Sequence, residues 1–271
     1  MVDRQPIALV GCGKMGGALL DGWLSNGIDE SDLIVIEPHG LELTGIRSNI
    51  IVVRDPGDLK TDFSPKVIVF AVKPEALDSV VPLYRNFKAG GPVYISIAAG
   101  RTIASFERLL GNDAGIIRVM PNTPASIGRG ISVGCSNSNV TEMQKELCHE
   151  LFKAVGATAW IDEEALMDPV TAVSGSGPAY VFLLIEALTE AGVRAGLERQ
   201  LAENLAKVTV AGSGALALEV SESPASLREA VTSPGGTTAA ALDVLMGEDG
   251  IEKLMGRAVE AATARSQILA K

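Results

Sequence analysis

The first 160 residues alternate short runs of consecutive apolar residues with stretches in which apolar residues recur at helical spacing. Continuous, β-branched apolar runs are typical of parallel strands that are covered on both faces. Strands are predicted at residues 7–10, 33–37, 50–53, 67–72, 93–98 and 116–120. The helical stretches between them indicate right-handed β-α-β units. The pattern therefore predicts an open, doubly wound parallel sheet in the N-terminal part of the chain.

From about Glu164 onwards the β-branched runs disappear and Ala, Leu and Glu dominate, which predicts helices. One helix is expected to begin at Pro178, because proline is favoured in a first helical turn, and two more over residues 199–220 and 250–269. The helix from Pro178 is apolar nearly all round, so it must be buried on every side. The C-terminal region is too small to bury it alone, so an intertwined homodimer is expected. The predicted domains are residues 1–163 and residues 164–271.

Composition narrows the function classes. Hydrophobic residues make up 47% of the 271 residues and charged residues 21%, as in a folded globular protein. The net charge of −10 and the aromatic content of 4% argue against a nucleic-acid partner, whose binding depends on neutralising phosphates. The N-terminus lacks the apolar core of a signal peptide. Glu186 and Glu190 interrupt the most apolar segment well short of the ~20 residues that a membrane span needs. A cytoplasmic protein with no membrane partner is expected.

The side chains that usually carry catalysis are few. Cys12, Cys135 and Cys148 are scattered and odd in number, so buried thiols are favoured over a disulfide framework or a zinc site, and no metal is expected. His149 lies off the apolar stripe of its predicted helix, and His39 has no suitable neighbour. A Ser-His-Asp or Cys-His site would need one of these two histidines, so hydrolases are largely excluded.

A glycine-rich turn follows the first predicted strand. The stretch VGCGKMGGALL contains a complete G-x-G-x-x-G with Gly11, Gly13 and Gly16. In a strand-turn-helix context these glycines permit a tight turn, close approach of a pyrophosphate and close helix packing. Amides at the start of the following helix bind phosphates. The turn therefore predicts a dinucleotide site.

Other candidate coenzyme contacts lie where later strands end. Glu37 stands 21 residues after Gly16, where an acid accepts hydrogen bonds from the adenosine ribose and disfavours a 2′-phosphate. On this ground NAD is favoured over NADP, although a solvated loop acid is the alternative. The turns at 71–74 and 96–100 should line the coenzyme crevice. Lys73 is a candidate donor to the nicotinamide ribose, or a solvated lysine at a helix start.

A second glycine turn lies near the C-terminus, in SPGGTTAAALDVL. Gly235 and Gly236 lead into a predicted helix whose first turn holds Thr237 or Thr238. Exposed amides and hydroxyls there form a neutral receptor that suits one carboxylate. An ordinary N-cap with flexible glycines is the alternative.

These motifs occur together in an order that resembles the Δ1-pyrroline-5-carboxylate reductase family. The resemblance covers the full length, from VGCGKMGGALL through FAVKP, SIAAG, RVMPNTPA and VSGSGPAY to SPGGTT. The stretch LREAVTSPGGTTAAALDVL is the most specific, because unrelated Rossmann enzymes lack it.

The resemblance implies a Rossmann-type doubly wound parallel sheet followed by an all-α C-terminal dimerisation and substrate domain. It implies reduction of 1-pyrroline-5-carboxylate to L-proline with NADPH or NADH, the last step of proline biosynthesis. Family members are dimers with interleaved C-terminal helices, often assembled into a decamer, with an active site that uses both subunits.

Site residues follow from the motifs and the resemblance together. Expected coenzyme contacts are Val10, Gly11, Cys12, Gly13, Lys14, Met15, Gly16, Glu37, Ala71, Val72, Lys73, Pro74, Ser96, Ala98 and Ala99. Expected substrate contacts are Glu164, Ser233, Gly235, Gly236, Thr237 and Thr238, of which Thr238 matches the hydroxyl at the ring nitrogen and is the expected catalytic residue.

The chain departs from the family at two places. Ala230 stands where some relatives carry a polar ligand contact, and IEPHG around Glu37 differs from the Ser- or Arg-containing versions associated with 2′-phosphate binding. Use of either coenzyme is therefore expected.

Two other readings stay open from the residues alone. A β-hydroxyacid dehydrogenase would need a helix lysine for proton transfer, for which Lys207 is the mid-helix candidate. A non-catalytic nucleotide sensor would not need the substrate turn.

Overall fold

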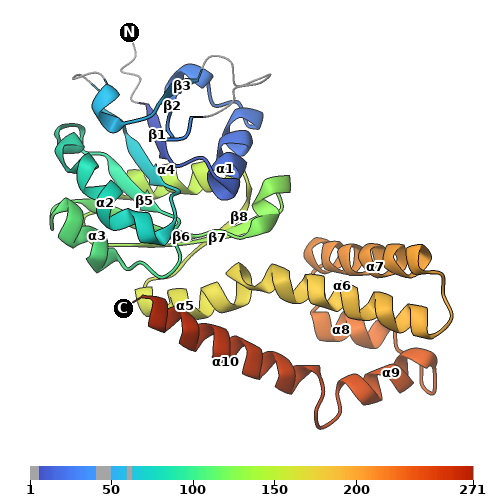
Figure 1. Cartoon of the computed structure of the whole chain (residues 1–271). Helices are drawn as coiled ribbons and strands as arrows, with labels where there is room; N and C mark the ends of the chain where they lie inside the picture. The colour runs from blue at the N-terminus through green and yellow to red at the C-terminus, as the bar shows by residue number, and fades with distance from the viewer. Residues whose placement is uncertain (1–5, 41–49, 60–62, 271) are drawn as a thin grey trace. The chain divides into compact units, whose positions relative to one another are not determined.

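The computed structural model describes residues 6–40, 50–59 and 63–270. Two compact units make up the chain (Figure 1). Unit 1 comprises Met1–Gly175 and Ala262–Lys271, and unit 2 comprises Ser176–Ala261. The boundaries of these units differ from those of the predicted domains, residues 1–163 and 164–271. The division into a coenzyme domain and a substrate domain at residue 164 stays a prediction.

Unit 1 is built on an eight-stranded sheet with the order β3-β2-β1-β4-β5-β6-β7-β8. The strands are β1 (Ile7–Val10), β2 (Leu33–Ile36), β3 (Ile51–Val53), β4 (Val67–Phe70), β5 (Val93–Ser96), β6 (Gly115–Met120), β7 (Gly130–Ser136) and β8 (Gly156–Trp160). Neighbours from β3 to β6 pair in parallel, which confirms the six predicted strands and the doubly wound parallel sheet. The carboxyl ends of β1, β4 and β5 therefore lie at one edge, where such sheets bind ligands.

Two strands extend the predicted sheet. β7 pairs antiparallel with β6, and β8 pairs in parallel with β7. Their sequences, GISVGCS and GATAW, contain small residues in place of β-branched runs. β8 is also mostly exposed, so it shows none of the continuous apolar pattern that marks a covered strand.

Helices cover both faces of the sheet and form two hydrophobic cores. They are α1 (Lys14–Ser25), α2 (Leu77–Val80), α3 (Ile103–Leu110), α4 (Glu142–Lys153) and α5 (Met167–Val170). One core joins the sheet to α1 and α4, and the other joins it to α2, α3 and α5. Trp23 of α1 is fully buried, and its indole N–H donates to the carbonyl of Leu151 in α4 at 2.8 Å. This bond links the two helices on the first face.

Unit 2 is helical, as predicted. Its elements are α6 (Gly177–Arg194), α7 (Arg199–Glu219), α8 (Pro224–Ala230) and α9 (Thr237–Leu245), and α10 (Ile251–Leu269) begins in unit 2 and ends in unit 1. Pro178 lies in the first turn of α6, as expected. A Cβ at Gly192 would lie 3.2 Å from the Ala202 side chain, so α6 and α7 approach closely through small residues.

Helix α6 leaves most of its apolar surface uncovered within one chain. Its only buried residue is Thr189. Large apolar side chains stand open along it, among them Phe182 at 57% and Leu183 at 63% exposure. The expectation that Glu186 and Glu190 interrupt this segment well short of a membrane span was wrong: by length and composition alone Glu164–Arg194 is apolar enough to cross a membrane, a property that core helices share. Exposed apolar surface of this extent marks an interaction site.

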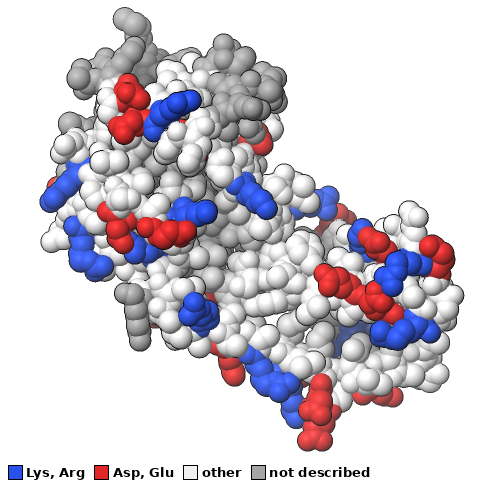
Figure 2. Space-filling view, in the orientation of Figure 1, with Lys and Arg blue, Asp and Glu red and all other residues white. Residues whose placement is uncertain are grey.

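Charged side chains of both signs are interspersed on the visible face of the molecule (Figure 2). Such a mixture on a chain of net charge −10 does not form a single basic stripe on that face.

We expect Trp23→Phe to lower the free energy of unfolding by about 2 kcal/mol, because it leaves the buried Leu151 carbonyl without its donor. Urea unfolding followed by far-UV circular dichroism at fixed chain concentration measures this. The matched control is Trp160→Phe, since Trp160 is 37% exposed. Equal shifts of the urea unfolding midpoint in the two variants would show that the hydrogen bond of Trp23 does not stabilise the protein.

Candidate active site

The glycine-rich turn between β1 and α1 is built by close backbone approach. Gly11 has a φ of +88°, and a Cβ there would lie 2.8 Å from Val72 Cγ1. A Cβ at Gly16 would lie 2.4 Å from the Gly11 carbonyl oxygen. Both distances are shorter than real side chains allow. Glycine is therefore required at both positions, as the sequence predicts.

Helix α1 begins at this turn with its first amides available to a ligand. Gly13 is the N-cap residue and supplies no side-chain hydrogen bond. A Cβ at Gly13 would meet no atom within 4 Å, so the space in front of the helix start is open. First-turn amides have no intrahelical partner, and the helix dipole favours negative charge there. The turn fits a pyrophosphate.

Glu37 is brought against the same turn. Its Oε2 accepts a hydrogen bond from the Cys12 amide at 2.8 Å, and its Oε1 accepts one from the His39 amide at 3.3 Å. The carboxylate thus stands at the end of β2 beside the turn, where it can accept ribose hydroxyls and repel a phosphate. The sequence has no Lys or Arg from residue 38 to residue 46. Of the segment that follows Glu37, residues 41–49 lie outside the described residues.

The other predicted coenzyme segments lie at the same edge of unit 1. The Ala71 amide donates to the Val10 carbonyl at 2.8 Å, which holds residues 71–74 beside the glycine turn. The Ile97 amide donates to the Phe70 carbonyl at 3.2 Å and holds residues 96–99 beside them. Ser96 and Ala98 are buried, whereas Lys73 is exposed. The structure therefore brings the three predicted coenzyme segments and Glu37 together.

The predicted substrate turn is assembled within unit 2. Gly235 has a φ of +69°, and the Gly236 amide donates to the Ser233 carbonyl at 3.0 Å. Gly236 is the N-cap of α9 and, like Gly13, supplies no side-chain cap. Thr237 is exposed and Thr238 is half-buried, and among the described residues neither hydroxyl forms a hydrogen bond with the chain. Their amides and hydroxyls remain open to a ligand.

Glu164, the predicted substrate-site acid, lies in unit 1 and already has two partners. Its Oε1 accepts a hydrogen bond from the Ile103 amide at 2.8 Å and pairs with Arg118 Nη1 at 3.0 Å. Sequence reasoning missed Arg118. The signal was present, because an arginine interrupts the otherwise apolar strand GIIRVM.

Cys135, Cys148 and Lys207 lack the surroundings that adapt a thiol or an amine to catalysis. Burial raises the pKa of Cys148 to about 12 and also raises the pKa of Cys135, which disfavours their reactive thiolate forms, as expected for core residues. Cys12 is only half-buried, so the expectation of three buried thiols was wrong for this residue. Lys207, the candidate proton donor of a β-hydroxyacid dehydrogenase, is exposed on α7 and ion-paired with Glu203. It lacks the buried setting that would adapt a lysine to proton transfer.

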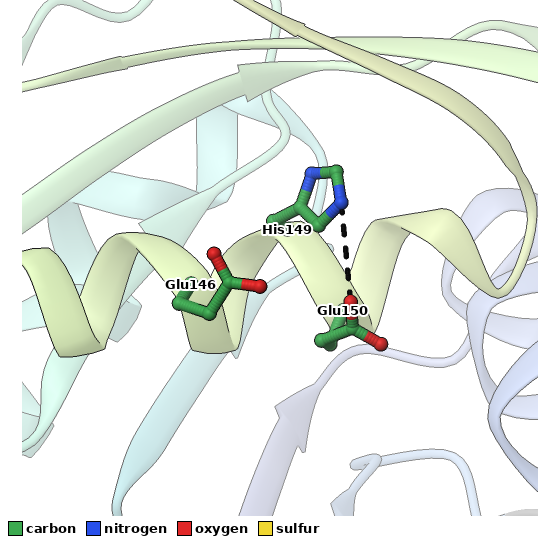
Figure 3. Close-up of side chains that lie close together, drawn as sticks. All are labelled: Glu146, His149 and Glu150. Atoms are coloured by element: carbon green, nitrogen blue, oxygen red, sulfur yellow. Dashed lines mark ion pairs between the residues drawn. The ribbon is translucent and has the colours of Figure 1, made fainter.

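A separate group of acids and a histidine lies on α4 (Figure 3). Potential ligand atoms of Glu146, His149 and Glu150 lie within 4.8 Å of one another. His149 Nδ1 is 2.7 Å from the Thr158 hydroxyl, and His149 Nε2 is 3.9 Å from Glu150 Oε1. Both glutamates are exposed, and all three residues lie on one helix apart from the coenzyme edge. Solvated carboxylates of this kind are common, and we assign them no metal.

Comparisons with known proteins agree with this geometry. A family described as pyrroline-5-carboxylate reductase dimerisation matches residues 164–269, and one described as NADP oxidoreductase coenzyme F420-dependent matches residues 6–100. A pyrroline-5-carboxylate reductase of Pseudomonas aeruginosa is 37% identical over 98% of this chain and 97% of the relative.

Solved structures show the same likeness. A pyrroline-5-carboxylate reductase of Coxiella burnetii superposes with a TM-score of 0.91 at 34% identity, over 99% of this chain and 100% of that chain. A pyrroline carboxylate reductase of Plasmodium falciparum with NADP bound gives a TM-score of 0.86 at 32% identity, over 100% of both chains.

The glycine turn gives a matched pair of substitutions. Gly16→Ala should destabilise the protein by about 1–3 kcal/mol, because its Cβ would overlap the Gly11 carbonyl. It should also weaken coenzyme binding, measured by coenzyme fluorescence. Gly17→Ala is the control, since its Cβ would lie 4.0 Å from the nearest atom and alanine stabilises a helix interior by about 0.5–1 kcal/mol. Equal coenzyme affinity in both variants would contradict the assignment of this turn.

Proposed function

Because the chain belongs to the pyrroline-5-carboxylate reductase family, we propose how its residues support the reduction of 1-pyrroline-5-carboxylate to L-proline, the last step of proline biosynthesis. The enzyme is an oxidoreductase that uses NAD(P)H. The reaction adds a hydride to C5 of the cyclic imine and a proton to its nitrogen, and the bound coenzyme supplies the hydride. The chain must therefore hold two anionic molecules and align them.

Unit 1 holds the coenzyme at the carboxyl edge of its sheet. Residues 10–16 form the turn at the pyrophosphate, which the uncapped amides at the start of α1 bind. Glu37 accepts the adenosine ribose hydroxyls, and residues 71–74 with Ser96, Ala98 and Ala99 line the nicotinamide end. The open space at Gly13 and the uncapped start of α1 support the phosphate assignment. Lys73, which is exposed, donates to a hydroxyl of the nicotinamide ribose.

Unit 2 holds the substrate carboxylate at the start of α9. The amides that follow Gly235, together with the hydroxyls of Ser233, Thr237 and Thr238, bind one carboxylate. Gly236 caps α9 without a competing side chain, and the helix dipole favours the anion. This uncapped glycine start carries the proposal, because it supplies an anion receptor with no charged side chain.

Thr238 orients the ring nitrogen in this arrangement. A threonine hydroxyl is too weak an acid to be an efficient proton donor at neutral pH. An imine is basic enough to take its proton from solvent, which explains why the site needs no histidine. The chief contribution of the chain is proximity, since it holds C5 of the substrate against the hydride donor.

Glu164 is the acid of the site. Its Oε1 is engaged by Ile103 and Arg118, and among the described residues its Oε2 accepts no hydrogen bond from the protein. Oε2 is the oxygen that can face a bound molecule.

The dimer is the unit of assembly, since residues 164–269 match a dimerisation family and α6 exposes the apolar surface that a second subunit covers. We further propose that dimers assemble into a decamer, that the active site uses both subunits, and that the enzyme works in the cytoplasm without membrane or nucleic-acid partners.

Thr238→Ala should lower kcat about 10²-fold, because an unaligned substrate loses the benefit of proximity. The KM for the coenzyme should stay within a factor of two. Steady-state absorbance loss of the coenzyme at 340 nm with 1-pyrroline-5-carboxylate measures both. Thr238→Ser is the control that keeps the hydroxyl and should retain most of the activity. An alanine variant as fast as wild type would remove Thr238 from the mechanism.

Glu37→Ser should shift the ratio of kcat/KM for NADPH to that for NADH about tenfold towards NADPH, since it removes a negative charge near the 2′ position. Glu142→Ser makes the same change in net charge on α4 and should leave the ratio unchanged. A ratio that moves equally in both variants would point to overall charge and away from a local contact.

A further inference from the structure

The strand β6 carries a buried cation that the reaction does not explain. Arg118 is 4% exposed. In register it stands between Ser96 of β5 and Cys135 of β7, so the three side chains share one face of the sheet. That face is the one covered by α3 and α5. A guanidinium in such a place needs a partner, because an unpaired buried charge is strongly unfavourable.

The partner of Arg118 is Glu164, and the pair reaches a third group. Glu164 Oε1 lies 3.0 Å from Arg118 Nη1 and accepts the Ile103 amide at 2.8 Å. Ile103 is the first residue of α3. One carboxylate oxygen therefore ties the middle of the sheet to the start of this helix.

The loop that precedes α3 is residues 96–102, which includes the nicotinamide-lining residues of the proposed function. It leaves the sheet at Ser96, whose hydroxyl accepts the Ala98 amide at 3.3 Å. It turns at Gly100, which has a φ of +71° and whose Cβ would lie 3.0 Å from Leu269. It ends at Thr102, the N-cap of α3. The strand fixes one end of the loop, and the Glu164 bond to Ile103 fixes the other.

We propose that Arg118 and Glu164 form a clamp that positions the 96–102 loop for the nicotinamide end of the coenzyme, with Arg118 as a positioning residue that acts through Glu164. The inference rests on the proposed function for the assignment of this loop. It gives Glu164 a second role through Oε1, separate from any contact that Oε2 makes with substrate.

Two hydrogen bonds to Glu164 Oε1 make the clamp a unit. Arg118 Nη2 is buried and has no hydrogen-bond partner among the described residues, and Glu164 is the ionic partner of Arg118. Removal of the carboxylate leaves the guanidinium unpaired beside Ser96, and the amide of Ile103 loses its acceptor. A neutral amide in place of the carboxylate keeps an oxygen for Ile103 and a hydrogen bond for Arg118.

The test is coenzyme binding to the full-length protein in the absence of substrate, measured by coenzyme fluorescence. Glu164→Ala should bind coenzyme about tenfold more weakly than wild type, whereas Glu164→Gln should stay within about threefold. Glu163→Ala is the matched control, because Glu163 is the exposed neighbour and forms no side-chain cap. Thermal unfolding establishes that each variant is folded at the assay temperature.

A coenzyme Kd that is unchanged in Glu164→Ala, with only the KM for substrate raised, would overturn the clamp and leave Glu164 as a substrate contact alone. Equal weakening in the alanine and glutamine variants would also overturn it, since the glutamine retains the bonds on which the clamp depends.

The pair is tested by a cycle with Arg118→Met. If the two residues act together, their effects should not add. The coenzyme Kd of the double variant Arg118→Met/Glu164→Ala should then be at most about twofold above the higher Kd of the two single variants. Losses that multiply would contradict a joint role. Failure of the wild-type protein to oxidise coenzyme with 1-pyrroline-5-carboxylate would contradict the proposed function and not the clamp. The coenzyme Kd could still be measured in that case.

Discussion

Helices α1 and α9 each begin after a glycine N-cap, Gly13 and Gly236, that supplies no side-chain cap. Ser, Thr, Asp and Asn are the preferred N-cap residues, because their side chains accept hydrogen bonds from the first amides of a helix. Here the amides stay available, and the helix dipoles add positive potential. Binding depends on these helix starts, because both molecules that the enzyme aligns carry negative charge. Lys14 is the only lysine or arginine within residues 10–16 and 233–238.

These helix starts explain why so few reactive side chains are needed. Close approach at Gly11 and Gly16 packs the first turn against residues 71 and 72, which follow β4. With the hydride carried by the coenzyme, the chain has to bind and align. Polar groups nearby serve the same end. Glu37 is held by the turn itself, and Glu164 is held by Arg118 and the start of α3.

Local signals explain how much the sequence predicted. Covered parallel strands produce apolar runs, so six strands and the glycine turn could be read directly, whereas β7 and β8 lack such runs because small residues replace them. The pairing of Arg118 with Glu164 joins positions 46 residues apart and leaves no periodic trace. The apolar sequence of α6 indicated a partner subunit, since the C-terminal region alone is too small to bury it. The individual coenzyme and substrate contacts stay predictions.

The most direct test of the central claim is a crystal structure of the oligomer with L-proline and oxidised coenzyme bound. The account predicts the proline carboxylate within hydrogen-bond distance of the amides that follow Gly235, with the ring nitrogen beside Thr238 and the coenzyme pyrophosphate at the start of α1. A proline carboxylate bound by a lysine or arginine side chain, away from the start of α9, would contradict it.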